Sequence, residues 1–519
     1  MSTVKMIVCC TCVALLYNGC KTKINKSPDR LGEISFSPTG NAGAQPAFKK
    51  GLLLLHSFEY ADAAEEFQNA KKIDPDFVMA YWGEAMTYNH PLWQEQDYNK
   101  GKETLNQLAA SPEERINKAK TGLEKDFLGG INILYGKGNK AERDSSYAAY
   151  MGALYKKYPG NDEVASFYSL SLNGWGTTGM LKTVLADAGK IALEILERSP
   201  KHPGALHYLI HAYDNPDYAA LALVTADKYA IVAKDAGHAV HMPAHTYLAL
   251  GLWEKVISSN EVSWTAEQKR KERKKLNNDA LGYHAFHWLQ YGYLQKGNKE
   301  KARSMLDSME QYCKQLPSAK ARGHMLFLKT TYLAETNDYS NEVVNISVQQ
   351  KDLNIVTRAR NYFVTGMDAY YKNNTAGIGD IILKLSAERL IEEGKTTGDG
   401  LRVCGNINRA LPTKTDLQET EVMELQLKAM QAWMKKDAVA AEKFLHQATK
   451  LQRVSGYSYG PPAIVKPSFE MYGEWLLENN RPKEALEQFN LSLQMMPNKT
   501  LSLKGKKMAE ERSKATASL

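Results

Sequence analysis

Residues 51–75, "GLLLLHSFEYADAAEEFQNAKKIDP", place small, aromatic and proline residues at fixed spacings. From Gly51, an alanine follows after 12 residues, a phenylalanine four residues later and a proline eight residues after that. The same offsets return near the other end of the chain, in "GEWLLENNRPKEALEQFNLSLQMMP" at residues 473–497. Small residues allow two helices to cross closely, the aromatic ring fills the gap, and proline ends the second helix. The two sets are Gly51, Ala63, Phe67 and Pro75, and Gly473, Ala485, Phe489 and Pro497.

This spacing is typical of the tetratricopeptide repeat, which has about 34 residues in two antiparallel helices. Less regular units of the same kind are "YGYLQKGNKEKARSML" (291–306) and "AWMKKDAVAAEKFL" (432–445). Helical periodicity begins near Gln45 and continues along the chain, whereas alternating β-branched runs are scarce. The sequence therefore predicts an all-α, tetratricopeptide-type α-solenoid of helix-turn-helix hairpins, with the inner helices lining a concave groove.

The N-terminus has the features of an export signal. A largely apolar stretch over residues 6–16 is followed by "YNGC", which ends at Cys20. The stretch is too short to span a bilayer. It resembles a bacterial lipoprotein signal, although Tyr17 and Asn18 depart from the usual pattern. We therefore expect cleavage after residue 19, lipidation of Cys20 and an exported protein anchored to the outer membrane. A plain secretory signal or an uncleaved anchor are the alternatives.

The rest of the chain divides by composition. Residues 20–44 are rich in Ser, Pro, Gly and charge without apolar periodicity, which predicts a flexible tether. We expect N-terminal hairpins over 45–110, a histidine-rich helical region over 111–300 and further repeats over 301–519. No later segment has the ~20 uninterrupted apolar residues of a spanning helix.

Charge and cysteine usage exclude several functions. The chain has a formal net charge of +8, and the basic run "KRKERKK" (269–275) could bind nucleic acid. On an exported protein we interpret this run as a solvated helix face and expect no nucleic-acid partner. Only Cys313 and Cys404 follow the signal, which is too few for a disulfide framework or a zinc knuckle. Walker, GxSxG, CxxC and HExxH motifs are absent from the sequence.

Histidines concentrate in three short stretches. "HPGALHYLIHAYD" (202–214), "HAVHMPAH" (238–245) and "YHAFHW" (283–288) contain eight of the 12 histidines of the chain. Proline is favoured at the first position of a helix, and Pro203 and Pro243 are placed to begin two of them. The expected helices recur about every forty residues and should all be inner helices that face the groove. Their predicted ranges are 203–213, 243–253 and 279–295.

The spacing within these helices indicates a metal site. His207 and His211 are four residues apart, so both imidazoles lie on one helix face. His241 and His245 have the same spacing, although Pro243 intervenes. Neighbouring helices lie 8–10 Å apart, so a single ion could join two of them. We therefore predict that these four histidines bind zinc, copper or iron. His238 follows Gly237, a helix-stop signal, and is expected in a loop.

The groove around this site has several interpretations. The main prediction is that it binds a peptide, protein or small ligand without metal, because tetratricopeptide grooves commonly present polar and aromatic side chains. The rival is a metal-dependent enzyme, an oxidoreductase or hydrolase, that uses the same histidines. A scaffold role and ordinary interhelical packing stay open. The residues expected to line the groove are His90, Asp214, His284, His287, Tyr208 and Trp288.

Four stretches carry a family resemblance: "MAYWGEAMTYNHPLW" (79–93), "HPGALHYLIHAYDNPDYA" (202–219), "HAVHMPAHTYLALGLWEKVISSNEVSW" (238–264) and "YHAFHWLQYGYLQKG" (283–297). With its HPGxxHYxIHxxD and HMPxH motifs, the chain resembles a bacterial family of tetratricopeptide-repeat lipoproteins over most of its mature length. The family usually has HMPSHI where this chain has "HMPAHT", so Ala244 replaces a hydroxyl and the histidines are kept. The resemblance implies the solenoid fold and a histidine-lined groove, without an activity.

Overall fold

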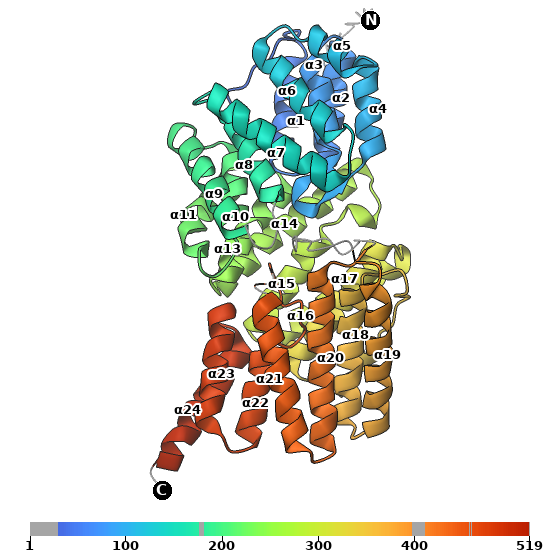
Figure 1. Cartoon of the computed structure of the whole chain (residues 1–519), viewed down its shortest axis with the longest axis vertical. Coiled ribbons are helices and arrows are strands. Elements are labelled where there is room, and N and C mark those ends of the chain that lie inside the picture. Colours follow the sequence, from blue (N-terminus) through green and yellow to red (C-terminus); the bar gives the residue numbers. More distant parts are fainter. Residues whose placement is uncertain (1–29, 176–180, 397–410, 456, 458, 518–519) are drawn as a thin grey trace, which may run out of the picture.

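The structure is a computed structural model that describes residues 30–175, 181–396, 411–455, 457 and 459–517. The described chain is almost entirely helical (Figure 1). Within these residues the only strands are the two-residue β1 (Asn89–His90) and β2 (Glu95–Gln96), which pair antiparallel around the short 3-10 helix η1 (Pro91–Trp93). The all-α prediction is confirmed.

Most helices follow one another with short connections, although the one between α17 and α18 covers residues 337–354. The N-terminal helices are α1 (Gln45–His56), α2 (Tyr60–Ile73), α3 (Val78–Met86), α4 (Tyr98–Leu108), α5 (Pro112–Lys118), α6 (Gly122–Leu134), α7 (Lys140–Lys157), α8 (Asp162–Gly174), α9 (Leu181–Arg198), α10 (Pro203–Ala212), α11 (Ala219–Val232), α12 (Gly237–His241), α13 (Pro243–Ala249) and α14 (Trp253–Lys274). The C-terminal helices are α15 (Tyr283–Gln295), α16 (Lys299–Gln315), α17 (Ala319–Thr336), α18 (Ile355–Tyr371), α19 (Thr375–Glu393), α20 (Lys414–Met434), α21 (Ala438–Ser455), α22 (Ser468–Glu478), α23 (Pro482–Met495) and α24 (Thr500–Ala517). The 3-10 helices η2 (Asn278–Ala280) and η3 (Glu342–Asn345) lie in two of the connections.

The repeat spacing corresponds to a packing motif that occurs at both ends of the solenoid. Phe67 of α2 lies against Gly51 of α1 and Gly83 of α3, where an added Cβ would come within 3.0 and 2.4 Å of its ring. The aromatic residue thus fills a gap that exists only because both neighbouring helices have glycine there. The corresponding residues near the C-terminus are Gly473, Phe489 and Gly505. This shared packing confirms the tetratricopeptide-type solenoid.

A common turn joins the two helices of many hairpins. In six of them the second residue after the first helix has a left-handed backbone, and the N–H of the next residue donates to the carbonyl five residues earlier. This is the Schellman arrangement, which satisfies helix-end carbonyls. Both of the less regular units predicted from sequence, at 291–306 and 432–445, contain this turn. The left-handed residues are Phe58, Gly251, Gly297, Asn373, Lys436 and Asn480, with φ from 56° to 76°.

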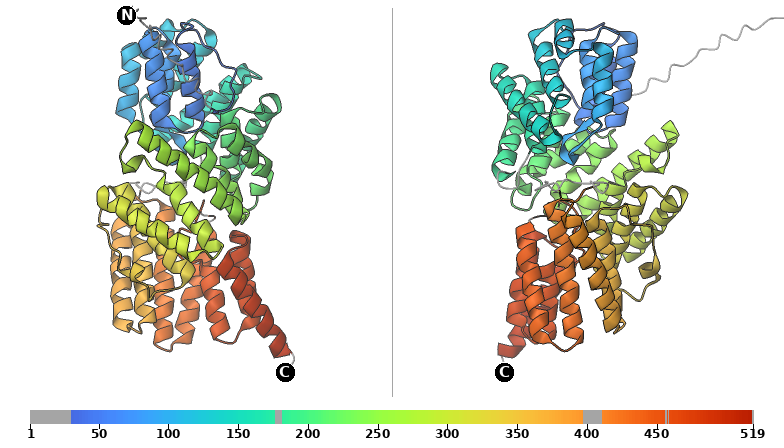
Figure 2. Two further views of the ribbon diagram at one scale, coloured as in Figure 1. Left: turned by 180° about the vertical axis from the view of Figure 1, so that it is seen from behind. Right: turned by 45° about the vertical axis from the view of Figure 1, so that its right-hand side comes forward.

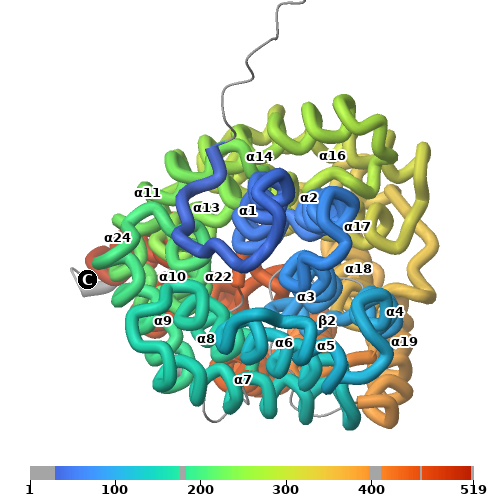
Figure 3. The backbone as a smooth tube through the Cα atoms, turned by 90° about the horizontal axis from the view of Figure 1, so that it is seen from above, coloured from blue at the N-terminus to red at the C-terminus, as the bar shows by residue number. Residues whose placement is uncertain are grey.

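The solenoid winds into two connected parts. Helices α1–α14 form the upper part in Figure 1 and most of the later helices form the lower part, an arrangement that is also clear from behind (Figure 2). Seen along the long axis, the N-terminal helices follow a ring, and α1 packs against α10 (Figure 3). Two large hydrophobic cores, an N-terminal and a C-terminal one, meet on α15. This helix contributes Trp288 and Tyr291 to the N-terminal core, and Phe286 and Leu289 to the C-terminal core. The helices on both sides of the predicted boundary at residue 110 share the N-terminal core.

The expected tether does not extend over residues 30–44. Leu31 and Ile34 are buried in the N-terminal core, and the N–H of Glu33 donates to the carbonyl of Lys201. The main chain of Arg30 also pairs with Asp235. This segment packs because its few apolar residues reach the core, a contact that local composition does not reveal. The predicted signal (1–19), the lipidation site Cys20 and Cys404 lie outside the described residues.

No helix among the described residues is both long and apolar enough to cross a bilayer. Cys313 on α16 is a buried free thiol.

Candidate metal centre

The histidine helices form close to their predicted positions. α10 begins at Pro203, and the ring of His202 caps it by accepting the N–H of Ala205 (3.2 Å). α13 begins at Pro243 but ends at Ala249 rather than at residue 253, because Gly251 forms the left-handed turn. α15 begins at residue 283, four residues later than expected. These helices bring the three histidine stretches together.

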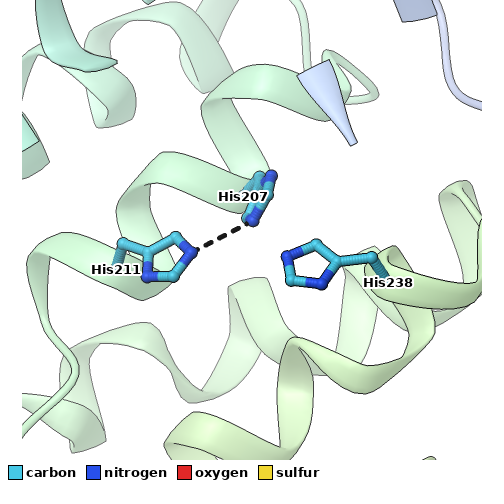
Figure 4. A group of neighbouring side chains, drawn as sticks. All are labelled: His207, His211 and His238. Atoms are coloured by element: carbon cyan, nitrogen blue, oxygen red, sulfur yellow. Dashed lines mark hydrogen bonds between the residues drawn. The ribbon is translucent and has the colours of Figure 1, made fainter. Parts of the chain in front are cut away.

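Six histidines gather into two groups of three. In each group the ligand nitrogens all lie within 4.8 Å of one another. In the first group the three imidazoles converge on one point (Figure 4). The predicted set of His207, His211, His241 and His245 is therefore divided between the groups, with one predicted pair in each. The first triad is His207, His211 and His238; the second triad is His241, His245 and His284.

Two nitrogens of the first triad have nearly the spacing that ligands of one ion require. His207 Nε2 and His211 Nε2 share a hydrogen bond of 3.2 Å, which a bound ion would replace. Two imidazole nitrogens bound at 2.0–2.1 Å across an angle of 109–120° would be about 3.3–3.6 Å apart. A single ion could therefore bind both nitrogens after a shift of a few tenths of an ångström.

The two triads are neighbours. The ring centroids of His211 and His245 are 5.6 Å apart, and those of His238 and His241 are 6.0 Å apart. The short helix α12 links them, because its first histidine belongs to the first triad and its last histidine to the second. The six rings thus form one continuous cluster across α10, α12, α13 and α15.

Acceptors behind the rings fix the orientation of three histidines. His207 Nδ1 donates to the carbonyl of His56 (2.7 Å), His241 Nδ1 to Asn260 Oδ1 (2.6 Å), and His245 Nδ1 to Asp214 Oδ2 (2.5 Å). The amide of Asn260 is itself oriented, because its Nδ2 donates to the carbonyl of Val256 (2.8 Å). Each ring therefore carries its proton on Nδ1 and directs the lone pair of Nε2 into the cluster. Metal-binding histidines characteristically have such outer acceptors.

The cluster is uncharged, and half of its rings are fully buried. His207, His241 and His245 are at most 1% exposed, whereas His211, His238 and His284 are half-buried. Burial, followed by the neighbouring histidines, lowers the pKa of His241 to about 3. The same causes hold other pKa values well below the ordinary range, at His207, His211, His238 and His284. The imidazoles are therefore neutral at neutral pH, which is the form that binds metal. The Nε2 atoms of His238 and His241 are buried without a hydrogen-bond partner.

Aromatic rings enclose the cluster. Phe58 lies 4.2 Å from His207 and Trp288 lies 4.4 Å from His245, measured between ring centroids. Phe58 has a left-handed backbone (φ 57°), which is rare for a bulky residue, whereas the corresponding turns of the other hairpins have Gly, Asn or Lys. Strain of this kind is usual where function requires a particular side chain. Here the ring of Phe58 closes one side of the first triad.

Most residues predicted to line an open groove lie in the interior instead. Tyr208, Trp288, Asp214 and His287 are between 0% and 6% exposed. Tyr208 and Trp288 pack in the N-terminal core, and His287 bonds to Thr331 (2.9 Å). Helix packing therefore hides these residues from a ligand in a groove. Of the remaining two, His284 completes the second triad, and the partly exposed His90 stacks on Tyr60 with centroids 4.0 Å apart.

A third group with the same ligand spacing, formed by His56, Glu163 and His202, is joined internally by hydrogen bonds. His56 Nε2 lies 2.8 Å from Glu163 Oε2, and His56 Nδ1 bonds to the hydroxyl of Tyr208 (2.9 Å). His202 uses Nδ1 for the helix cap, so its Nε2 carries the proton and faces Glu163 Oε1 at 3.3 Å. Three of the four ring nitrogens are hydrogen-bonded within the protein, and His202 Nε2 faces Glu163 without a hydrogen bond. The two histidines hold the pKa of Glu163 well below its usual range despite burial.

Sequence reasoning missed three parts of the centre. His238 was expected in a loop because Gly237 resembles a helix stop, yet Gly237 begins α12. His284 was assigned to the groove because a single ion was not expected to reach a third helix. Asn260 lies on the outer helix α14, and nothing in its own sequence context indicated a contact with His241.

Comparisons with known proteins add little. No protein-family model matches the sequence, and no curated protein matches it significantly. Similar solved structures include yeast Tom70 (11% identity over 90% of this chain and 88% of that chain, TM-score 0.32). Others are the APC/C hetero-tetramer Cut9–Hcn1 (14%, 91% and 78%, TM-score 0.35) and the human IFIT1 dimer (13%, 80% and 86%, TM-score 0.35). With TM-scores this low, these likenesses support no conclusion about this chain.

Proposed function

We propose that this α-solenoid is a metal-binding protein that holds two transition-metal ions, one in each histidine triad. The observation that carries the proposal is the pair of converging triads, with ligand nitrogens within 4.8 Å of one another. The outer acceptors support it, because they turn the lone pairs of His207, His241 and His245 toward the cluster. Packing alone would not require the buried Nε2 atoms of His238 and His241 to be without partners.

Elemental analysis of protein purified without a histidine tag tests this proposal. We expect two equivalents of transition metal per chain. The matched control is His446→Ala, which removes an exposed histidine on α21 and should leave the metal content unchanged. Protein that binds no metal after incubation with zinc, copper and iron salts would contradict the proposal.

Removal of an outer acceptor should weaken one site selectively. In Asn260→Ala, His241 loses the oxygen that fixes its ring, so we expect about a 10- to 100-fold lower affinity at the second triad. The first triad should keep its affinity. Competition with a chelator measures both sites, and Ser258→Ala, an exposed position on the same helix, is the control. Equal weakening of both sites would argue against separate triads.

We also propose that the protein is lipid-anchored to the outer membrane of the cell envelope through Cys20, as the "YNGC" signal suggests. Cys20→Ala should release the protein into the soluble fraction, because a signal without lipidation leaves no anchor. Cell fractionation followed by immunoblotting measures the shift. If Cys20→Ala stays in the membrane fraction at the wild-type level, the anchor is not a lipid on this cysteine.

A further inference from the structure

The ligand set of the two triads is entirely neutral. No Asp, Glu or Cys of the described chain belongs to either group. Two carboxyl groups contact the cluster. Asp214 accepts a hydrogen bond from His245 Nδ1, on the ring edge that faces away from the bound ion, and Glu59 accepts one from the backbone N–H of His238. An ion in either triad would thus be bound by imidazoles alone, with one carboxyl group behind a ligand rather than in contact with the ion.

Two ions in adjacent triads must also repel each other. Coulomb energy scales with the product of the charges, so two divalent ions repel about four times as strongly as two monovalent ions at the same separation. Moving an ion from water into a buried site costs free energy in proportion to the square of its charge, which again gives about a fourfold difference. The neighbouring rings of Phe58 and Trp288 provide little screening. Charge therefore favours monovalent ions strongly.

The number of ligands is compatible with the same choice. Zinc held by three protein ligands completes its coordination with a water molecule, and divalent iron and copper commonly take four to six ligands. Each triad offers three nitrogens. Copper(I) has a filled d shell and a single charge, so it has no geometric demand beyond three donors, and imidazole is a suitable ligand for copper.

From these observations we infer that the cluster is a two-site copper(I) centre, with one Cu⁺ ion in each triad. The inference rests on the metal site proposed above and narrows it to one ion and one oxidation state. No electron transfer is needed to fill the centre, because the ions bind in the reduced form.

The test is an anaerobic titration of the metal-free full chain with copper(I), supplied as its acetonitrile complex, against the chelator bathocuproine disulfonate. A parallel titration uses Zn²⁺. We expect two copper ions per chain that Zn²⁺ does not displace, an X-ray absorption edge of Cu(I) and no paramagnetic resonance signal. His446→Ala should behave as wild type, and His241→Ala, with helicity checked by circular dichroism, should retain one copper ion.

The outcomes separate the two proposals. Two Zn²⁺ or Fe²⁺ ions that copper(I) does not displace, or copper bound as paramagnetic Cu(II), would overturn the copper(I) inference and leave the metal-binding function standing. A chain that binds none of these ions would overturn both. Because the decisive measurements use the wild-type chain, they do not depend on whether a variant folds.

Discussion

Alanine at His207 is expected to lower the metal content from two ions per chain to one, and alanine at His245 should have the same effect. Each substitution removes one of three ligands from a different triad. The double variant should bind no metal. Inductively coupled plasma mass spectrometry on purified protein measures all three, with His446→Ala as the control. A single four-histidine site would instead lose all of its metal with either substitution.

The same variants should change stability. An ion present at a thousand times its dissociation constant adds about 4 kcal/mol to the free energy of unfolding. Each single variant should lose about one such contribution when metal is present, and should differ much less from wild type when a chelator is present. Chemical unfolding with and without metal measures this difference. If the loss is equal in both conditions, the histidines act in packing rather than in binding.

Lys499→Met, which removes the ammonium group, should be among the most destabilising substitutions outside the metal centre. Lys499 precedes α24 and is fully buried, with Nζ at 2.9 Å from Glu335 of α17 and 3.1 Å from Glu470 of α22. These carboxylates raise the pKa of Lys499 against the effect of burial. Lys499→Met would remove the cation that two buried carboxylates share, at a cost of about 3–5 kcal/mol.

Urea unfolding of Lys499→Met measures this cost. The matched control is Lys507→Met on α24, whose side chain is 79% exposed and should contribute almost nothing. Equal midpoints for the two variants would show that the buried network does not hold the last repeat in place. Restoration of stability by adding Glu335→Gln and Glu470→Gln would identify the uncompensated charges as the cause.

The fold was predictable because the residue patterns that specify it lie within short stretches of the sequence. Gly51 and Phe67 are fixed by close helix crossing, and the same offsets at Gly473 and Phe489 identified the repeat at both ends of the chain. The boundaries at Pro203 and Pro243 also follow from local chemistry, since proline begins a helix without losing a needed N–H. The packing of residues 30–44 was missed because their partners, such as Lys201, are far away in the sequence.

The candidate site was only partly predictable. Four of the six histidines were chosen from their i, i+4 spacing, and this spacing holds across Pro243 because Met242 keeps helical angles (φ −52°, ψ −38°). How the rings divide between two ions depends on the rotation of α10, α12 and α15 about their own axes. That rotation is set by the packing of the outer helices, and no single helix encodes it.

The sequence by itself determined that this protein is an all-α solenoid, that its histidines lie on successive inner helices, and which residue types could bind metal. Periodicity and capping set these features, because they act within one or two turns of helix. Only the tertiary structure decided that His238 and His284 complete two triads, that Asn260 orients His241, and that His207, His241 and His245 are fully buried. These depend on contacts between helices remote in the chain, whose distances are fixed by side-chain packing throughout the superhelix.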